Sequence, residues 1–205
     1  ALVCGARLAD ASAVAQNAAD VVVGRFGTAV CSTSDLEGRL SLDGPVAVEA
    51  DELAEFLDTE RRDGRRIVFT NGCFDVLHRG HTTYLRQARA LGDVLVVAIN
   101  SDESVRRLKG PERPINAAAD RASVLASLEC VDVVTVFETD TPIPLLERLT
   151  PDVYVKGGDY TPEMLAETPV VRGYGGEVRI VDYVSSHSTT SLVERIRSRR
   201  GDAVP

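Results

Sequence analysis

The 205-residue chain has only three histidines, four scattered cysteines and no excess of positive charge. Its formal net charge of −8 argues against a general nucleic-acid binder or a membrane-surface protein, because both need basic patches. The cysteines form no C-x-x-C pair, which is typical of reduced cytosolic thiols and not of a disulfide framework or a zinc site. Apolar runs such as VLVVAI are far too short to span a bilayer. We therefore expect a cytoplasmic protein without a protein-held metal, and no nucleic-acid or membrane partner.

Short apolar, β-branched runs alternate with longer amphipathic segments from Ile67 onward. Strands that are apolar on both faces and are separated by helices predict a parallel sheet covered on both sides. We therefore predict an α/β domain over residues 66–200 with five parallel strands and helices on both faces, and a ligand site at the carboxyl ends of the strands. The expected strands are residues 67–69, 94–99, 131–137, 153–155 and 178–181.

The first 65 residues show a different pattern. Residues 46–65 predict one exposed helix that ends near Gly64 and links to the α/β domain. Residues 1–45 predict a helix, a short strand and a loop, which is too little to form a core. The start is a poor signal peptide and has no initiator methionine. We therefore expect the chain to be a piece of a longer protein.

Two of the three histidines lie in the stretch TNGCFDVLHRGH, directly after the first expected strand. Gly72 permits a tight turn there, and Gly80 would let a ligand approach the backbone closely. A helix that begins near Gly80 directs its free N–H groups into the same space, and His78 and His81 lie on one face of its first turn. Together these features favour a polyphosphate site. The alternative is a turn whose histidines only cap a helix.

The pairing of H-x-G-H after a first strand with S-T-T before a last helix resembles the signature of the cytidylyltransferase-like nucleotidyltransferases. Further stretches, VAINSDESVRRLKG, RPIN, DRASVLASLECVD and YVKGGDY, are similar to the adenylyltransferase domain of bacterial ADP-heptose synthesis, over roughly residues 48–198. Residues 1–45 are similar to the end of a ribokinase-like sugar kinase, which precedes that domain in many such proteins. The resemblance implies a Rossmann-like nucleotidyltransferase domain within a bifunctional chain, and a possible homodimer.

The reaction that the resemblance implies joins ATP to a heptose 1-phosphate and releases pyrophosphate. It needs alignment and charge neutralisation more than a strong base, because the attacking phosphate oxygen is already anionic. His78 and His81 would donate hydrogen bonds to the triphosphate, Lys109 would neutralise phosphate charge, and Mg²⁺ would be carried by the ATP phosphates. The residues expected to bind the nucleotide are Thr70, Asn71, Gly72, Cys73, Phe74, Gly80, Arg121, Lys156, Gly157, Asp159, Ser188, Thr189 and Thr190, and those expected to bind the acceptor are Asp75, Asn100 and Arg113.

Several of these residues have plain alternatives. Lys109 could be a solvated loop lysine, Arg121 could pair within its helix, and Asp75 could cap a turn. Lys156–Asp159 could form a tight turn, and Ser188 could be an ordinary helix cap. His187 stands before S-T-T where relatives commonly have glycine.

The function also has alternatives. A cytidylyltransferase of the same fold acting on glycerol 3-phosphate commonly carries an arginine shortly before S-T-T, which DYVSSHSTT lacks. A class I aminoacyl-tRNA synthetase shares H-x-G-H, but the acidic charge, the short length and the missing K-M-S-K-S-like loop argue against it. A catalytically silent nucleotide-binding regulatory domain remains a third hypothesis. The sequence does not distinguish adenine from cytosine.

Overall fold

The computed structural model describes residues 8–23, 29–33, 35–36, 47–158 and 161–181, and the chain divides into two compact units, Ala1–Pro45 and Val46–Pro205. In the first unit the main element is helix α1, Leu8–Val23. The strand expected after this helix is not found among the described residues 29–33, and residues 24–28 lie outside the description. The three valines of the run VVV instead continue the alanine-rich helix, in which β-branched residues are tolerated at a modest cost.

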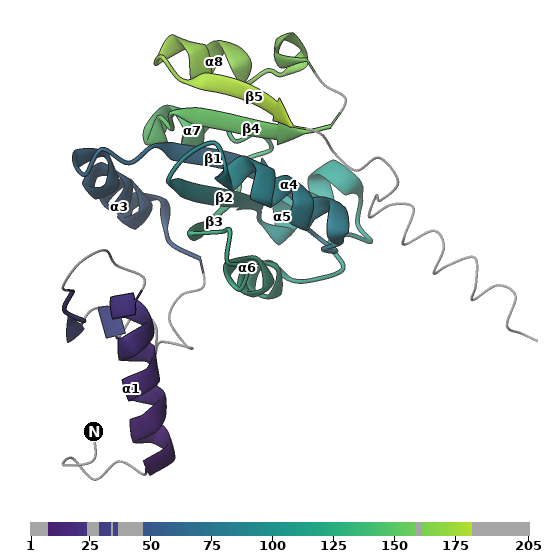
Figure 1. Cartoon of the computed structure of the whole chain (residues 1–205). Coiled ribbons are helices and arrows are strands. Elements are labelled where there is room, and N and C mark those ends of the chain that lie inside the picture. The colour runs from purple at the N-terminus through teal and green to yellow at the C-terminus, as the bar shows by residue number, and fades with distance from the viewer. Residues whose placement is uncertain (1–7, 24–28, 34, 37–46, 159–160, 182–205) are drawn as a thin grey trace, which may run out of the picture. The chain divides into compact units, whose positions relative to one another are not determined.

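The second unit contains the predicted sheet (Figure 1). Its strands are β1 (Ile67–Gly72), β2 (Val94–Asn100), β3 (Val133–Phe137), β4 (Val153–Gly157) and β5 (Glu177–Val181). They run in the order β3-β2-β1-β4-β5, and every neighbouring pair is parallel. The strand order reverses at β1, between β2 and β4. The predicted five-stranded parallel α/β sheet is thus confirmed, and its central strand is the one that leads into H-x-G-H.

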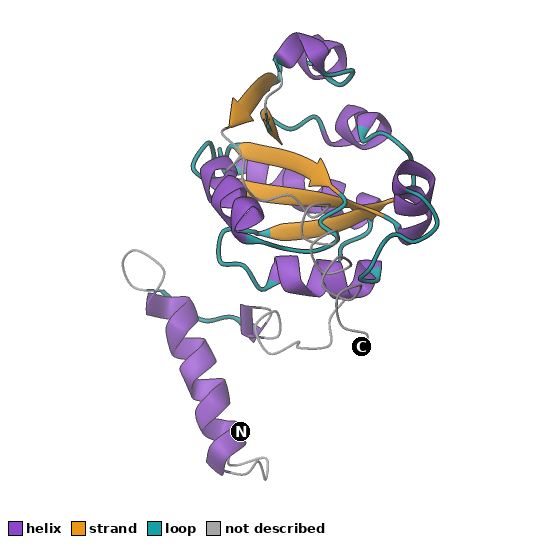
Figure 2. Cartoon of the chain, turned by 90° about the vertical axis from the view of Figure 1, so that its right-hand side faces the viewer, coloured by secondary structure: helices purple, strands orange, loops and turns teal. Residues whose placement is uncertain are grey.

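Helices cover both faces of this sheet (Figure 2). Alternate strand residues point to opposite faces, so Phe69 belongs to one apolar cluster and Val68 to the other. The first cluster includes residues of α3 (Ala50–Arg62), α7 (Ile143–Leu149) and α8 (Thr168–Gly173). The second includes residues of α4 (Arg79–Arg89) and α6 (Ala118–Ala126). The remaining described helices of this unit are α5 (Asp102–Lys109) and the 3₁₀ turn η2 (Pro162–Met164).

The helix expected to be an exposed linker is part of the domain core, which corrects the sequence analysis. Leu53 and Leu57 of α3 are 0% exposed and pack in the first cluster. The chain before the helix is also attached, because Val48 N–H donates to Val134 O at 2.9 Å and Thr135 Oγ1 donates to Val48 O at 2.8 Å. Two leucines four residues apart form an apolar stripe, and burying that stripe joins α3 to the sheet.

An aspartate precedes each of three strands and accepts a backbone hydrogen bond from the neighbouring strand. The carboxylate oxygen accepts at 2.7–2.8 Å, so it satisfies an N–H group that has no partner in the ladder. Asp132 explains why β3 begins two residues later than expected, since its side chain binds Leu95 N instead of extending the strand. The three pairs are Asp93 with Arg66, Asp132 with Leu95 and Asp152 with Ile67.

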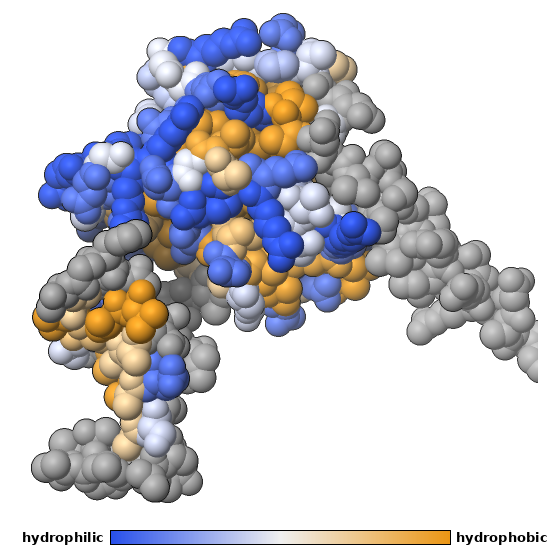
Figure 3. Space-filling view, viewed as in Figure 1, coloured by the Kyte–Doolittle hydropathy of each residue, from blue (hydrophilic) through white to orange (hydrophobic). Residues whose placement is uncertain are grey.

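The hydropathy of the surface differs between parts of the second unit. In the view of Figure 3, apolar residues gather over β4 and β5, whereas hydrophilic residues dominate over α3 and α8. In the part of the chain that the structure describes, no helix is long and apolar enough to cross a membrane.

Candidate active site

The two histidines of H-x-G-H stand at the first turn of α4. His78 is the N-cap residue in extended conformation, and His81 is the third residue of the helix. Their rings stack, with centroids 3.9 Å apart and planes inclined by 29°. The backbone N–H of His78 donates to Nδ1 of His81 at 3.4 Å. Because Nδ1 accepts, the ring proton of His81 is on Nε2, which makes Nε2 a hydrogen-bond donor.

His81 is a neutral imidazole at physiological pH. Burial lowers its pKa most, and together with the nearby His78 and Lys109 it brings the pKa from 6.5 to about 4. The ring also packs against Phe74 with centroids 5.3 Å apart. His81 therefore offers a fixed, uncharged N–H group to a ligand. Such a group stabilises developing negative charge without the desolvation penalty that a buried cation would carry.

A cavity of about 420 Å³ opens beside these histidines at the carboxyl ends of β1 and β4. It lies at the point where the strand order reverses, which is where parallel sheets bind ligands. The structure brings eight of the predicted site residues together in its wall. They are Asn71, Gly72, Cys73, Phe74, His81, Lys109, Lys156 and Gly157. Their roles toward ATP and the acceptor stay predictions.

Two lysines supply positive charge to this cavity in different ways. Lys109, the last residue of α5, is exposed, and within the described chain its ammonium group makes no hydrogen bond or ion pair. Lys156 is held deeper, with Nζ donating to Asn71 Oδ1 at 2.8 Å. Burial lowers the pKa of Lys156, while the nearby Glu167 opposes that shift. Lys109 is thus available to a mobile phosphate, whereas Lys156 is part of a fixed polar group.

Gly72 is needed because the ring of Phe74 lies close to its Cα, and not because of its backbone conformation. This corrects the sequence analysis, which gave a tight turn as the reason. A Cβ atom at Gly72 would lie 3.1 Å from the ring of Phe74, which is tighter than most real Cβ contacts. The residue of this turn with a left-handed backbone conformation is Phe74, with φ of 45°. A bulky residue rarely adopts such an angle, and strained positions of this kind concentrate at functional sites.

The structure places six other described residues of the predicted binding sets outside the cavity wall, namely Gly80 at the start of α4 and five residues with polar side chains. Each of the five has a buried side chain or donates to a buried group, and each is bonded to other protein groups. The hydroxyl of Thr70 donates to Val155 O at 3.0 Å and contacts the hydroxyl of Tyr84. The amide of Asn100 donates to Ser104 Oγ at 3.0 Å. The five are Thr70, Asp75, Asn100, Arg113 and Arg121, and their side chains support the loops instead of lining the cavity.

Arg121 shows why a charged side chain from a motif need not face the ligand. Its side chain is 1% exposed, and its guanidinium group donates to Asn116 O, Cys73 O, Asn100 O and Asp102 Oδ1. Most of its five N–H groups are therefore occupied by the protein. The ion pair with Asp102 reaches from α6 to α5, so the intrahelical pairing considered from sequence is wrong.

The remaining predicted residues include two on α4 and four beyond the described residues. His78 and Gly80 are at the start of α4, where Gly80 is buried. Asp159, Ser188, Thr189 and Thr190 lie outside the described residues, as do His187 and the expected last helix. Their proposed contacts with phosphate stay predictions.

Sequence reasoning missed three residues of the cavity wall, namely Tyr84, Leu165 and Glu167. Tyr84 lies one turn after His81, and this spacing places both on one face of α4. Leu165 and Glu167 lie between η2 and α8, in a stretch without a motif. Glu167 adds a carboxylate near Lys156 and the hydroxyl of Tyr154. Tyr154 in turn donates to Asn71 Oδ1 at 2.9 Å.

Metal-binding side chains are not grouped in the part of the chain that the structure describes. No three histidine, cysteine, aspartate or glutamate side chains among the described residues lie close enough to hold an ion. The carboxylate of Asp75 already accepts hydrogen bonds from Arg113, Ile115 and Asn116.

Comparisons with known proteins identify relatives of this chain. The cytidylyltransferase-like family matches residues 69–197 of the chain. The bifunctional protein HldE of Hahella chejuensis is 52% identical over 200 residues, which are 96% of this chain and 42% of that protein. The HldE of Geotalea uraniireducens is 48% identical over 201 residues, or 96% of this chain and 41% of that protein. A solved lipopolysaccharide core biosynthesis protein of Thermoplasma volcanium is 29% identical, with a TM-score of 0.49, and the match covers 58% of this chain and 97% of that one.

The chain spans about two fifths of the length of the curated relatives that it matches. The family match covers more than half of this chain and includes most of β1, the H-x-G-H turn and the cavity wall. The resemblance read from the sequence is therefore confirmed, and the chain belongs to the cytidylyltransferase-like family of nucleotidyltransferases.

Proposed function

We propose that this domain transfers the adenylyl group of ATP to the phosphate of a sugar 1-phosphate, namely D-glycero-β-D-manno-heptose 1-phosphate, and releases pyrophosphate. The observation that carries the proposal is the cavity in which the neutral N–H donor of His81 and the ammonium group of Lys109 line one space. Nucleotidyl transfer is the reaction class of the family. ATP and heptose are the choices favoured by the sequence stretches RLKG, RPIN and VKGGDY.

In this reaction an oxygen of the sugar phosphate forms a bond to the α-phosphorus of ATP. The bond from that phosphorus to the bridging oxygen breaks, and its electron pair leaves with pyrophosphate. Catalysis then consists of alignment and stabilisation of charge on phosphate oxygens. We assign His81 Nε2 to donate to a triphosphate oxygen and Lys109 to balance the charge of the acceptor or of the leaving group. Mg²⁺ is proposed to arrive on the ATP phosphates, keeping most of its waters.

The stacked pair of histidines fits this role because it is rigid. The ring of His81 is held by the His78 N–H group on one side and by Phe74 on another, so it needs little reorganisation as charge develops. The N–H groups at the start of α4 add the positive end of the helix dipole. The proposal therefore rests on fixed donors and one exposed cation.

A pyrophosphate-release screen tests the proposal with four nucleoside triphosphates and a panel of sugar 1-phosphates and glycerol 3-phosphate. We expect the fastest release with ATP and the heptose 1-phosphate. Faster release with CTP and glycerol 3-phosphate would overturn the substrate assignment and leave the reaction class intact. ATP binding without any pyrophosphate release would instead indicate a regulatory domain.

Lys109→Ala tests the acceptor side of the same site. It should lower kcat and kcat/KM together, because a contact formed mainly in the transition state affects both. Arg106→Ala is the matched control, since it removes an exposed cation from the same helix outside the cavity wall. An increase in KM alone would make Lys109 a substrate-binding residue without a catalytic role.

A further inference from the structure

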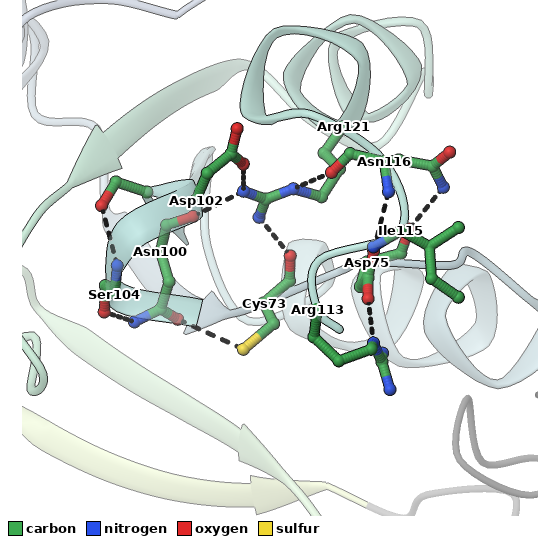
Figure 4. Close-up of polar contacts among 10 residues, drawn as sticks. Cys73, Asp75, Asn100, Asp102, Ser104, Arg113, Ile115, Asn116 and Arg121 are labelled. Carbon is green, nitrogen blue, oxygen red and sulfur yellow. Dashed lines mark hydrogen bonds and ion pairs between the residues drawn. The ribbon is translucent and has the colours of Figure 1, made fainter. Parts of the chain in front are cut away.

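The loop that follows β1 is attached to both ends of α5 by buried polar side chains (Figure 4). Arg121 makes the attachment at the start of that helix. One of its terminal nitrogens donates to Cys73 O in the loop, at 2.5 Å. The other donates to Asn100 O and to Asp102 Oδ1, both at 2.8 Å, where β2 ends and α5 begins. A single guanidinium group thus connects the loop to the start of α5.

Asp75 makes the attachment beyond the end of α5. Its residue is 3% exposed, and its carboxylate accepts from Ile115 N at 2.7 Å, from Asn116 N at 3.0 Å and from Arg113 Nε. The amide of Asn116 donates back to Asp75 O at 2.6 Å. Four hydrogen bonds therefore connect one loop residue to the segment 113–116. Several of them involve a charged group, which makes them shorter and stronger than neutral ones.

Lys109 lies on the chain between these two attachments. It is the last residue of α5, four residues before Arg113. His81 lies on the other side of the attached loop, at the first turn of α4. The two groups line the same cavity although they come from different helices. Their separation is therefore set by how firmly α5 is held to the loop after β1.

We propose that Asp75 is a positioning residue, which holds the segment after α5 so that Lys109 stays aligned with His81 across the cavity. This inference rests on the proposed function, because alignment matters only if the two groups act on one reacting phosphate. It replaces the expectation that Asp75 binds the acceptor. The residue is 3% exposed, and most acceptor sites of its two oxygens are occupied by three hydrogen bonds from protein groups.

Asp75→Asn is the most direct perturbation. The amide keeps the size of the carboxylate but replaces one of its two acceptor oxygens with an NH₂ group. With the amide oxygen kept toward the two backbone N–H groups, which both bind Oδ1, the NH₂ group faces Arg113 Nε, which then has no acceptor. The segment 113–116 should loosen. A displacement of about 1 Å in a catalytic group is enough to lower turnover roughly 10²-fold. We expect a loss of that order in kcat for Asp75→Asn, with little change in the KM for ATP.

A double-mutant cycle with Lys109→Ala shows whether Asp75 acts through Lys109. If it does, the two losses should not multiply, because residues that act as a unit are not additive. The double variant should then be at most about threefold slower than the slower of the two single variants. Multiplied losses in the double variant would overturn the proposal. Glu177→Gln is the matched control, because it removes a carboxylate that pairs with Arg66 at 2.8 Å at the amino end of the sheet. It should stay within twofold of the original protein.

Hydrogen exchange gives a readout that does not depend on activity. In Asp75→Asn the amides of Lys109, Gly110 and Glu112 should exchange at least tenfold faster, while those of β2 stay protected. Unchanged exchange at these three residues would overturn the proposal even in an active enzyme. Should Asp75→Asn not fold, Arg113→Gln takes its place in both experiments, because it removes one donor and keeps both backbone bonds to Asp75.

An inactive protein and a misassigned Asp75 would give different results. If the original protein releases no pyrophosphate with any nucleotide and acceptor, the proposed function is wrong, and the positioning role is overturned with it. If the original protein is active and Lys109→Ala is impaired, but the cycle is multiplicative, only the positioning role is wrong.

Discussion

Acidification should destabilise the folded protein through His81. The pKa of this imidazole is about 4 in the folded protein, against an ordinary value of 6.5, because burial disfavours the charged ring. Between those two values the unfolded chain takes up a proton that the folded chain does not. The free energy of unfolding therefore falls as the pH falls through this window. The contribution of His81 is fully present above the ordinary pKa and is lost below about pH 4.

The size of this effect follows from the gap between the two pKa values. At about 1.36 kcal/mol per pH unit, the whole gap corresponds to roughly 3 kcal/mol. About 2 kcal/mol of it should be lost between pH 7 and pH 5. That is a large part of the stability of an ordinary domain, which is roughly 5–15 kcal/mol. The loss should therefore be measurable by urea unfolding.

His81→Gln isolates the contribution, because glutamine keeps a polar N–H group near the Nε2 position and does not titrate. Urea unfolding of the full chain, followed by far-UV circular dichroism, gives the free energy of unfolding at pH 7 and pH 5. The original protein should lose about 2 kcal/mol more than His81→Gln between these pH values. Equal losses in the two proteins would refute the reasoning, since they would mean that His81 titrates near its ordinary pKa in the folded state.

Three further outcomes test the site. His81→Ala should lower turnover by roughly 10²–10³, the usual effect of removing one transition-state donor, while the protein still folds; near-normal turnover would show that the imidazole is not a donor. A protein that begins at Val46 should still transfer nucleotide, because the described residues of the site all follow that position; a folded but inactive product would place part of residues 1–45 in the active site. ATP should slow alkylation of Cys73, which lines the cavity, but not of Cys130, whose thiol pKa is also raised by burial. Peptide mapping would show this, and equal protection of both cysteines would contradict the assigned cavity.

The sheet was predictable because its central strands are largely buried on both faces. Runs such as VLVVAI have no polar position to expose, and β2 is buried over all seven residues. Helix α3 was misjudged for a related reason. Most of its residues are polar or charged, so the stretch looked solvent-exposed, yet Leu53 and Leu57 alone are enough to attach it to the sheet. A narrow apolar stripe is a weaker sequence signal than a continuous apolar strand.

Much of the cavity wall was predictable because it follows the strands. Asn71–Phe74 and Lys156–Gly157 stand at the carboxyl ends of β1 and β4, where a parallel sheet presents its loops to a ligand. Glu167 was not predictable in this way. It belongs to the connection between η2 and α8, and only the packing of α8 against the sheet brings it near Lys156. No pattern of residues around Glu167 in the sequence indicates such a contact.

Charged residues within motifs were the hardest to assign, because sequence does not show what neutralises them. Lys109 and Arg121 both seemed suited to phosphate, yet Lys109 is exposed at the cavity while the side chain of Arg121 is 1% exposed and bonded to protein groups. The partners of Arg121 are up to 48 residues away in the chain, and those of Asp75 are 38 to 41 residues away. Only the packing of β1, β2 and α6 against one another brings these groups together. A buried cation with several protein acceptors is already neutralised, so it can hold the loops around a phosphate site without contacting the phosphate.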